Sequence, residues 1–241
     1  MIEMHCHILP NIDDGVRSFE ESIEIIKKLE NLGYEKIIIT PHYINGTSYN
    51  KNNEEKNKLF LELQKKLLEN NINIEMYLGN EIFLDENIIE DLKNNKCSAL
   101  NSSKYVLIEV SRDNTLNNFN EIIYNLINNG YIPILAHPER YMCVKRNKNI
   151  LKKWISMGVL LQINFESISG KYGLYAKKNV KFILKNNLAT FIGGDIHKSS
   201  STFFDNYWKN KKKIIKIIGE EKYEKLTNKN ILNIINNKET Y

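Results

Sequence analysis

Short apolar segments alternate with longer amphipathic ones along most of the 241 residues of the chain. The apolar segments are rich in β-branched residues, which is typical of buried strands. We therefore expect seven strands, at Ile2–His7, Lys36–Thr40, Asn73–Leu78, Tyr105–Val110, Ile132–Ala136, Val159–Ile163 and Ala189–Ile192.

The amphipathic stretches between these strands carry apolar residues at helical spacing. The first predicted helix opens at the capping box Ser18-Phe19-Glu20-Glu21, runs to about Asn31 and is followed by Gly33. We expect further helices at Asn53–Asn70, Asp85–Asn94, Leu116–Asn129, Lys148–Met157, Tyr172–Asn186, Thr202–Ile218 and Asn228–Asn236. Repeated strand–helix alternation predicts an α/β fold with a mostly parallel sheet, either open or closed into a barrel.

The composition narrows the class of protein. The formal net charge of +5 is mild and favours neither nucleic-acid nor membrane binding. The amino terminus lacks the pattern of a signal peptide, and no stretch approaches the roughly 18 apolar residues of a membrane span. The three cysteines, Cys6, Cys97 and Cys143, form no disulfide framework. We expect a cytoplasmic protein that does not insert into a membrane.

The five histidines all lie at, or just after, the carboxyl end of a predicted strand. Functional sites gather at this face of parallel α/β folds, and above all of barrels. Alternate strand residues point to one side, so two histidines separated by one residue can reach the same ion. The histidines are His5, His7, His42, His137 and His197.

Carboxylates follow the same rule. Glu81, Glu109 and Asp195 lie at or after strand ends, and Asp13 and Asp14 follow the first strand. An ionised carboxylate among apolar residues is costly unless it is paired or bound to a cation. Divalent cations would also relieve repulsion between neighbouring carboxylates. Mixed imidazole and carboxylate ligands suit zinc, manganese or iron better than magnesium or calcium alone.

Each of these motifs has a structural explanation when it is taken alone. A single buried histidine is usually a hydrogen-bonded core residue, and Asp13-Asp14-Gly15 is a turn signal. Glu109 could be an ion-paired strand residue. The prediction of a metal site depends on all of these groups sharing one face of the fold.

The run Met4-His5-Cys6-His7-Ile8-Leu9-Pro10-Asn11-Ile12-Asp13-Asp14-Gly15 resembles the first motif of the PHP (polymerase and histidinol phosphatase) superfamily. More narrowly, it resembles the manganese-dependent bacterial tyrosine phosphatases of capsule and exopolysaccharide gene clusters. The resemblance spans about Met1 to His197. Similar later motifs follow in the expected order, namely Thr40-Pro41-His42-Tyr43, Gly79-Asn80-Glu81-Ile82, Leu107-Ile108-Glu109, Ala136-His137-Pro138-Glu139-Arg140-Tyr141 and Gly194-Asp195-Ile196-His197.

This resemblance implies a distorted (β/α)7 barrel, the PHP fold, as a single domain over residues 1–241, with carboxyl-terminal helices at about 202–236. It also implies three divalent metal ions, with manganese expected and iron, zinc or magnesium as alternatives. Glu81 would bridge two ions, and Arg140 matches the family's arginine after the His-Pro-Glu motif. The implied ligands are His5, His7, Asp14, His42, Glu81, Glu109, His137, Asp195 and His197.

The chain departs from the family pattern at three places. Glu3 stands where the family usually has Asp, and Asn11 stands where Gly is common. After His197, where the family tends to have a second phosphate-holding arginine, the chain has Lys198. A lysine could supply a point charge there, without the bidentate fork of arginine.

The resemblance predicts hydrolysis of phosphotyrosine in a protein, with a bacterial tyrosine kinase of capsule synthesis as the expected substrate. Water held between two ions would attack phosphorus, and Arg140 would neutralise the phosphoryl oxygens. His42 or His197 could protonate the leaving phenolate. The alternatives are a small-molecule phosphatase, such as a histidinol-phosphate phosphatase, and a non-catalytic metal-binding regulatory module.

Two other phosphate chemistries lack their sequence motifs. Cysteine-dependent tyrosine phosphatases need an arginine six positions after the cysteine, but these positions hold Ile12, Ser103 and Asn149. There is also no phosphate loop of the G-x-x-x-x-G-K-[ST] type. A nuclease of the same superfamily is disfavoured by the weak net charge.

Overall fold

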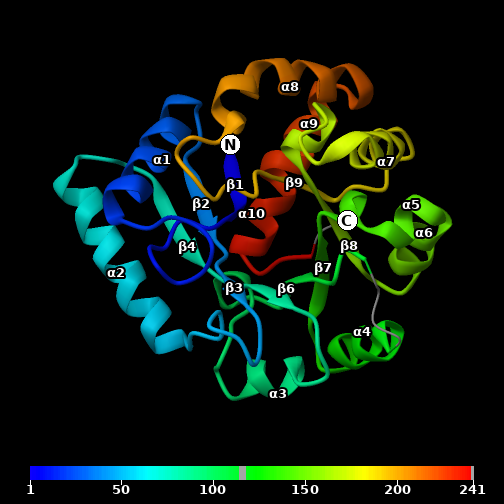
Figure 1. Ribbon diagram of the computed structural model, residues 1–241, viewed down its shortest axis with the longest axis horizontal. Coiled ribbons are helices and arrows are strands. Elements are labelled where there is room, and N and C mark those ends of the chain that lie inside the picture. The colour runs from blue at the N-terminus through cyan, green and yellow to red at the C-terminus, as the bar shows by residue number, and fades with distance from the viewer. Residues whose placement is uncertain (114–117, 240–241) are drawn as a thin grey trace.

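Parallel strands form the centre of the molecule in the computed structural model, which describes residues 1–113 and 118–239 (Figure 1). One sheet has the order β1-β2-β4 and the other the order β3-β5-β6-β7-β8-β9, and every pairing is parallel. The strands are β1 (Ile2–Cys6), β2 (Lys36–Ile39), β3 (His42–Tyr43), β4 (Glu75–Leu78), β5 (Glu81–Phe83), β6 (Tyr105–Glu109), β7 (Ile132–Ala136), β8 (Leu160–Asn164) and β9 (Phe191–Gly193).

Two of the seven predicted strands are interrupted and then continue. Strand β2 resumes as β3 beyond Thr40 and Pro41, and β4 resumes as β5 beyond Gly79 and Asn80. Proline has no N–H group to donate to a strand ladder. A Cβ atom on Gly79 would lie 2.7 Å from Cδ2 and 3.0 Å from Cα of Leu100, so any larger residue at this break would have to displace Leu100. The sequence pattern predicts that both strands end at the breaks and does not predict the short continuations.

The two sheets are joined into a barrel where β9 meets β1. Beyond β9, the N–H of Asp195 donates to the carbonyl of His5 at 2.8 Å. The N–H of His7 donates to the carbonyl of Ile196 at 2.8 Å, and Cys6 and Ile196 form a parallel bridge. The expectation of an α/β fold with a distorted (β/α)7 barrel is confirmed.

Helices surround the barrel (Figure 1). The N-cap of α1 is Ser18, whose side chain accepts from the N–H of Glu21 at 3.3 Å, as the capping box predicts. The sequence pattern does not predict α5, α9 or the π-helical turn at Lys225–Lys229. The helix predicted at Leu116–Asn129 begins outside the described residues. The helices are α1 (Phe19–Asn31), α2 (Asn53–Glu69), α3 (Ile88–Lys93), α4 (Phe119–Asn128), α5 (Met142–Arg146), α6 (Asn149–Ser156), α7 (Gly173–Lys185), α8 (Thr202–Ile218), α9 (Glu220–Glu224) and α10 (Asn230–Ile235).

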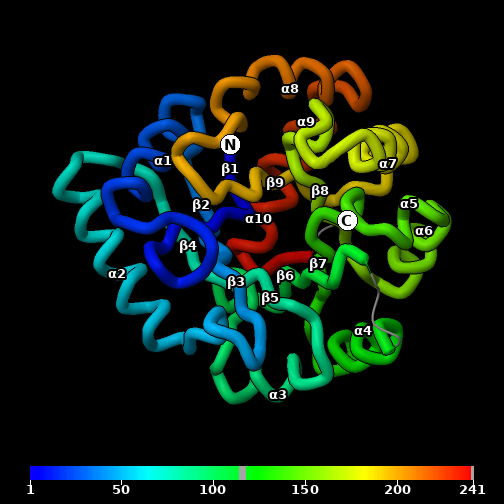
Figure 2. The backbone as a smooth tube through the Cα atoms, in the orientation of Figure 1, coloured from blue at the N-terminus to red at the C-terminus, as the bar shows by residue number. Residues whose placement is uncertain are grey.

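The last helix, α10, closes the amino-terminal end of the barrel. Its buried residues Ile231 and Ile234 pack with Ile2, Tyr105 and Phe191, which are the first residues of their strands. In Figure 2, α10 is the red segment near the middle of the ring of helices. The opposite, carboxyl-terminal end of the barrel is therefore the end at which a site can open.

Side chains change face within β1. Met4 belongs to the inner apolar cluster, whereas Cys6 belongs to the outer cluster between barrel and helices. The pairing of β1 with β2 shifts register between Glu3 and Cys6, as a bulge does. This shift lets His5 face the site although Met4 also faces inward. Among the described residues, no helix is long and apolar enough to cross a bilayer.

Candidate metal centre

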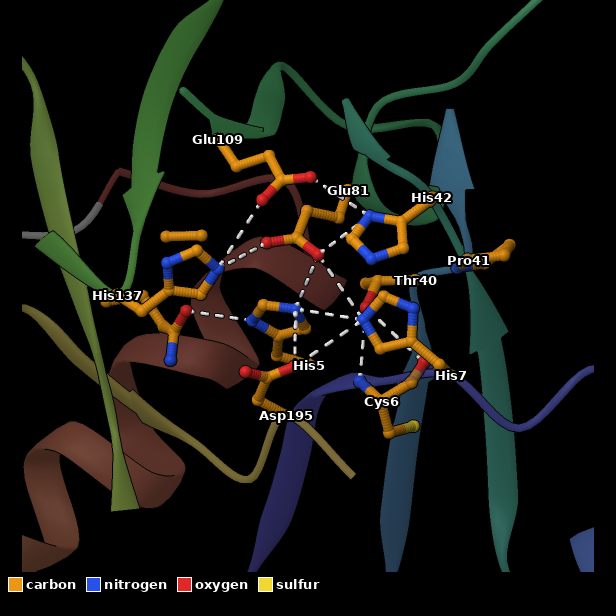
Figure 3. A network of polar contacts seen from close by, with 12 residues as sticks. His5, Cys6, His7, Thr40, Pro41, His42, Glu81, Glu109, His137 and Asp195 are labelled. Atoms are coloured by element: carbon orange, nitrogen blue, oxygen red, sulfur yellow. Dashed lines mark hydrogen bonds and ion pairs between the residues drawn. The ribbon is translucent and has the colours of Figure 1, made fainter. Parts of the chain in front are cut away.

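The structure brings all nine predicted ligands together at the carboxyl-terminal end of the barrel. Figure 3 shows all of them except Asp14 and His197. Glu81 lies at the centre of this group. Its Oε2 lies 3.1 Å from Nε2 of His5, 3.3 Å from Nε2 of His7 and 3.2 Å from Nδ1 of His42. Its Oε1 lies 2.9 Å from Nε2 of His137. Atoms that coordinate one ion at about 2.1 Å are themselves about 3 Å apart, so these separations fit shared ions.

Three overlapping groups of side chains could each hold an ion, because their ligand atoms lie within 4.8 Å of one another. Glu81 is the carboxylate that two of them share. Its two oxygens allow it to bridge ions, whereas a neutral imidazole has a single lone pair to offer. The groups are His7, Asp14, His42 and His197; His5, His7 and Glu81; and His42, Glu81 and Glu109.

The two remaining predicted ligands lie at the edges of these groups. Nε2 of His137 is 3.8 Å from Oε2 of Glu109. Oδ1 of Asp195 is 3.7 Å from Nε2 of His5 and from Nε2 of His7. Both therefore lie close enough to contribute to an ion held by their neighbours.

Hydrogen bonds on the outer nitrogens hold two histidines in the tautomer that a metal ligand needs. Nδ1 of His5 donates to Oε1 of Gln162 at 2.9 Å, and Nδ1 of His7 donates to Oδ2 of Asp13 at 2.8 Å. In both rings Nε2 is then free to point at Glu81. Such outer contacts orient metal-bound histidines and raise their basicity.

These orienting residues are not predicted from the sequence, where Asp14 and not Asp13 is the expected ligand. Asp13 also accepts the backbone N–H of His42 at 2.9 Å. Gln162 does have a signal in the sequence, because it is a polar residue inside an apolar strand. Asn164, at the end of that strand, donates to Oδ2 of Asp195 at 2.6 Å.

Electrostatic attraction between imidazoles and carboxylates dominates the site. Burial opposes the protonation of His5, but Glu81 and Asp195 outweigh it and raise the pKa of His5 to about 9. Burial likewise opposes ionisation of Glu81, yet the surrounding histidines hold its pKa well below the usual range. A hydrogen bond from His197 lowers the pKa of Asp14 to about 2. Glu81 and Asp14 therefore stay ionised and ready to bind cations.

Two candidate ligands have backbone angles that residues other than glycine seldom adopt. The φ angle is 37° at His137 and 52° at Asp195, each just beyond a barrel strand. Such conformations cost about 1–3 kcal/mol each and concentrate at functional sites. Buried Glu139 stabilises the first turn by accepting from the N–H of Asn164 at 2.9 Å and the hydroxyl of Ser167 at 2.6 Å.

The site opens into a cavity of about 460 Å³. Apart from the predicted ligands, the charged residues that line it are all cations, namely Arg112, Arg140, Lys171 and Lys198. Nη1 of Arg140 lies 2.8 Å from Oδ2 of Asp195, and its guanidinium lies 4.4 Å from the centre of the Tyr172 ring. The cavity is thus suited to a phosphate group.

Cys6 does not take part in this site. It is fully buried, and burial raises the pKa of its thiol well above the usual range. Its Sγ lies 3.7 Å from the carbonyl oxygen of Ile38. The prediction that Cys6 is a buried strand residue, pointing away from His5 and His7, is confirmed.

Comparisons with known proteins agree with this geometry. The model of the capsular polysaccharide synthesis family CpsB/CapC matches residues 1–236. CapC from Staphylococcus aureus is 34% identical over 204 residues, which cover 85% of this chain and 80% of CapC. The tyrosine-protein phosphatase YwqE from Bacillus subtilis (strain 168) is 32% identical over 204 residues, with the same coverage of 85% and 80%.

Solved structures extend the comparison to the whole chain. One comes from work on YwqE of Bacillus subtilis and CpsB of Streptococcus pneumoniae, described as unique metal-dependent tyrosine phosphatases. It matches with a TM-score of 0.90 and 30% identity and covers 100% of this chain and 96% of its own. Histidinol phosphate phosphatase from Lactococcus lactis subsp. lactis Il1403 shares the fold, with a TM-score of 0.56, 15% identity and coverage of 88% and 93%. The chain belongs to the CpsB/CapC family of capsular polysaccharide synthesis.

Proposed function

We propose that this chain is a metal-dependent tyrosine phosphatase that removes phosphate from phosphotyrosine in a protein of capsular polysaccharide synthesis. The observation that carries the proposal is the convergence of imidazoles on the Glu81 carboxylate at the open end of the barrel. Membership of the CpsB/CapC family and similarity to the tyrosine phosphatases YwqE and CpsB support the proposal.

The residues present fit divalent ions. Oε2 of Glu81 and Nδ1 of His42, which face each other across the site, are buried and have no hydrogen-bond partner among the described residues. Leaving such an atom unsatisfied costs about 1–3 kcal/mol, which a coordinated cation would offset. We infer three ions with Glu81 as the bridge, and manganese as the expected metal, with iron, zinc or magnesium as alternatives. When bound, such ions lower the pKa of water and stabilise negative charge on phosphoryl oxygens.

The proposed ligand set is the one implied by the sequence motifs, because each member lies near one of the three groups. Outer residues then keep the ligands in place, with Asp13 and Gln162 fixing the rings of His7 and His5. The set is His5, His7, Asp14, His42, Glu81, Glu109, His137, Asp195 and His197.

Arg140 is the proposed phosphate-binding residue. Burial opposes its charge, but Asp195 and its other neighbours raise the pKa of the guanidinium, so it stays protonated. Asp195 fixes one side of the guanidinium, and the Tyr172 ring covers its face. An arginine held in this way can donate two parallel hydrogen bonds to a phosphate.

His42 and His197 are the candidates for protonating the phenolate that leaves from phosphotyrosine. Their side chains are 12% and 26% exposed, whereas those of His5 and His7 are fully buried. Nε2 of His197 lies 3.3 Å from Oδ1 of Asp14, and Nε2 of His42 lies 3.5 Å from the same atom. Either ring would protonate the phenolate only through a nitrogen that is not bound to an ion, and both rings lie beside the cavity.

A tyrosine kinase of capsule synthesis is the proposed substrate, and the cytoplasm is the proposed location. The cationic lining suits an anionic phosphoprotein, and Arg112 and Lys198 form no ion pair with another described residue. The candidate ligands extend from His5 to His197, and α10 completes the barrel, so we propose that the whole chain acts as one phosphoesterase unit.

Hydrolysis of a phosphotyrosyl peptide by the metal-stripped chain, with and without manganese, tests this function. We expect manganese to restore activity, and Arg140→Met to reduce kcat/KM on the order of 10²–10³-fold. Arg146→Met is the matched control, since Arg146 is an exposed arginine that lines no part of the cavity. Hydrolysis of histidinol phosphate but not of the peptide would support the small-molecule alternative. Metal binding without turnover of either compound would support the regulatory module.

A further inference from the structure

A lysine of α2 is buried beside one of the two strand breaks. Lys56 is 1% exposed, although Lys58 and Lys65 on the same helix are exposed. No carboxylate among the described residues pairs with Lys56. Its Nζ instead donates to the carbonyl of Gly79 at 3.3 Å, to the hydroxyl of Ser98 at 2.5 Å and to Oδ1 of Asn80.

Burial of the Lys56 ammonium group is unfavourable in free energy, so its retention at this position needs a physical reason. Desolvation lowers the pKa of Lys56 to about 7, because the charged ammonium is removed from water. Lysine is seldom fully buried unless it is paired. The three acceptors around Nζ are all part of, or next to, the segment that links β4 to β5.

The second member of this arrangement, Asn80, links the two strand breaks. Its Oδ1 accepts from Lys56 and from the N–H of Ser98 at 3.0 Å, and its Nδ2 donates to the carbonyl of Pro41 at 3.0 Å. The N–H of Glu81 donates to the same carbonyl at 3.1 Å. The break before β3 and the break before β5 are thus fastened to each other.

The residues directly after these breaks are two of the central candidate ligands. His42 follows Pro41, Glu81 follows Asn80, and His42 and Glu81 are paired in register between β3 and β5. Their side chains meet with Nδ1 of His42 3.2 Å from Oε2 of Glu81. A rotation of either peptide segment would therefore move a ligand at the centre of the site.

We propose that Lys56 and Asn80 are positioning residues for the metal centre, in which Lys56 holds the Asn80 amide and the amide holds Pro41, so that His42 and Glu81 meet in coordinating geometry. This inference rests on the proposed metal centre. It explains why a polar lysine and a polar amide are both buried beside the two breaks, between β2 and β3 and between β4 and β5.

Manganese titration of the metal-stripped chain by calorimetry tests the proposal, with manganese electron paramagnetic resonance reporting on the coordination. Lys56→Met removes the ammonium. Asn80→Asp keeps an acceptor for Lys56 but removes the donor to Pro41. For both variants we expect manganese binding to weaken by about 10-fold or more, as for other residues that orient ligands, and the resonance spectrum to change. Lys65→Met, on the exposed side of the same helix, should bind as wild type.

Folding is monitored separately by circular dichroism and thermal unfolding. Asn80→Asp should unfold close to the wild-type temperature, because the new carboxylate can pair with Lys56. If Lys56→Met fails to fold, Asn80→Asp and the milder Ser98→Ala decide the question. Since Lys56 acts through Asn80, the double variant should bind manganese no more weakly than the more severe single variant.

The proposal would be overturned if folded Asn80→Asp and Lys56→Met both bound manganese with the affinity and the spectrum of wild type. If Lys56→Met does not fold, the same result in Asn80→Asp and Ser98→Ala would overturn it. The readout is metal binding and does not require turnover. A wild-type chain that binds manganese but leaves phosphotyrosine intact would therefore refute the proposed function, while the comparison between variants would still decide the positioning role.

Discussion

The two ends of the barrel both contain fully buried side chains but have opposite chemistry. At the amino end, Ile2 and Phe191 pack against Ile234 of α10, and all three are at most 2% exposed. At the carboxyl end, His5 and Glu81 are also fully buried, yet they are ionisable. Burial stabilises the first end by the hydrophobic effect and destabilises the second unless cations or ion pairs compensate. The amino end thus stabilises the fold, and the carboxyl end carries the proposed metal centre.

Removing the central carboxylate should have the largest effect. In Glu81→Gln the bridge between the proposed ions is lost, so we expect manganese affinity and kcat to fall by more than the roughly 10–100-fold typical of outer-sphere residues. Calorimetry and peptide hydrolysis measure the two quantities. Glu62→Gln, an exposed change on α2, is the control. Tight manganese binding by Glu81→Gln would show that the ions lie elsewhere.

A substitution at the amino end of the barrel should lower stability without changing manganese affinity. Ile234→Ala leaves a cavity under α10 and should lower the free energy of unfolding by about 2–5 kcal/mol. Its manganese affinity should remain that of wild type, because Ile234 contacts no predicted ligand. Chemical denaturation and calorimetry check these two outcomes. A large loss of affinity in the folded variant would mean that the two ends are coupled.

Asp13→Asn sharpens the distinction between ligands and the residues that orient them. The variant keeps the shape of the side chain but weakens the acceptor for Nδ1–H of His7. Manganese affinity should fall by about 10–100-fold, which is less than for Glu81→Gln. An affinity loss as large as that of Glu81→Gln would indicate that Asp13 is itself a ligand.

The pH dependence should be the smallest effect. In the metal-free chain the pKa of His5 is raised from 6.5 to about 9, so its ion pairs stabilise the fold fully below pH 6.5. That contribution is lost as the pH rises through 9, and the melting temperature of the metal-free chain should fall over this interval. Manganese needs deprotonated histidine, so its stabilising effect should grow over the same interval. The melting temperature is measured against pH with and without manganese. The prediction would be contradicted if the two melting temperatures changed in parallel with pH.

Much of the fold and of the candidate site follows from local sequence patterns. Strand periodicity predicts where each barrel strand ends, and the histidines follow those ends, so their meeting could be inferred without coordinates. The short strands β3 and β5 were missed because two or three residues carry no periodicity.

The rest depends on contacts between distant segments. The partnership of His5 with Gln162 joins residues that are 157 positions apart. Lys56 looks like an ordinary surface lysine in its helix until the β4–β5 break packs against it. The left-handed backbone of His137 and Asp195 likewise has no signal in the sequence, because neither is a glycine.

The most direct test of the central claim is the number of manganese ions that the metal-stripped chain binds, measured by calorimetry and by metal analysis. The account predicts three ions per chain, bound at the carboxyl end of the barrel and lost in Glu81→Gln. Absence of stoichiometric metal binding would contradict the metal centre and every function proposed from it.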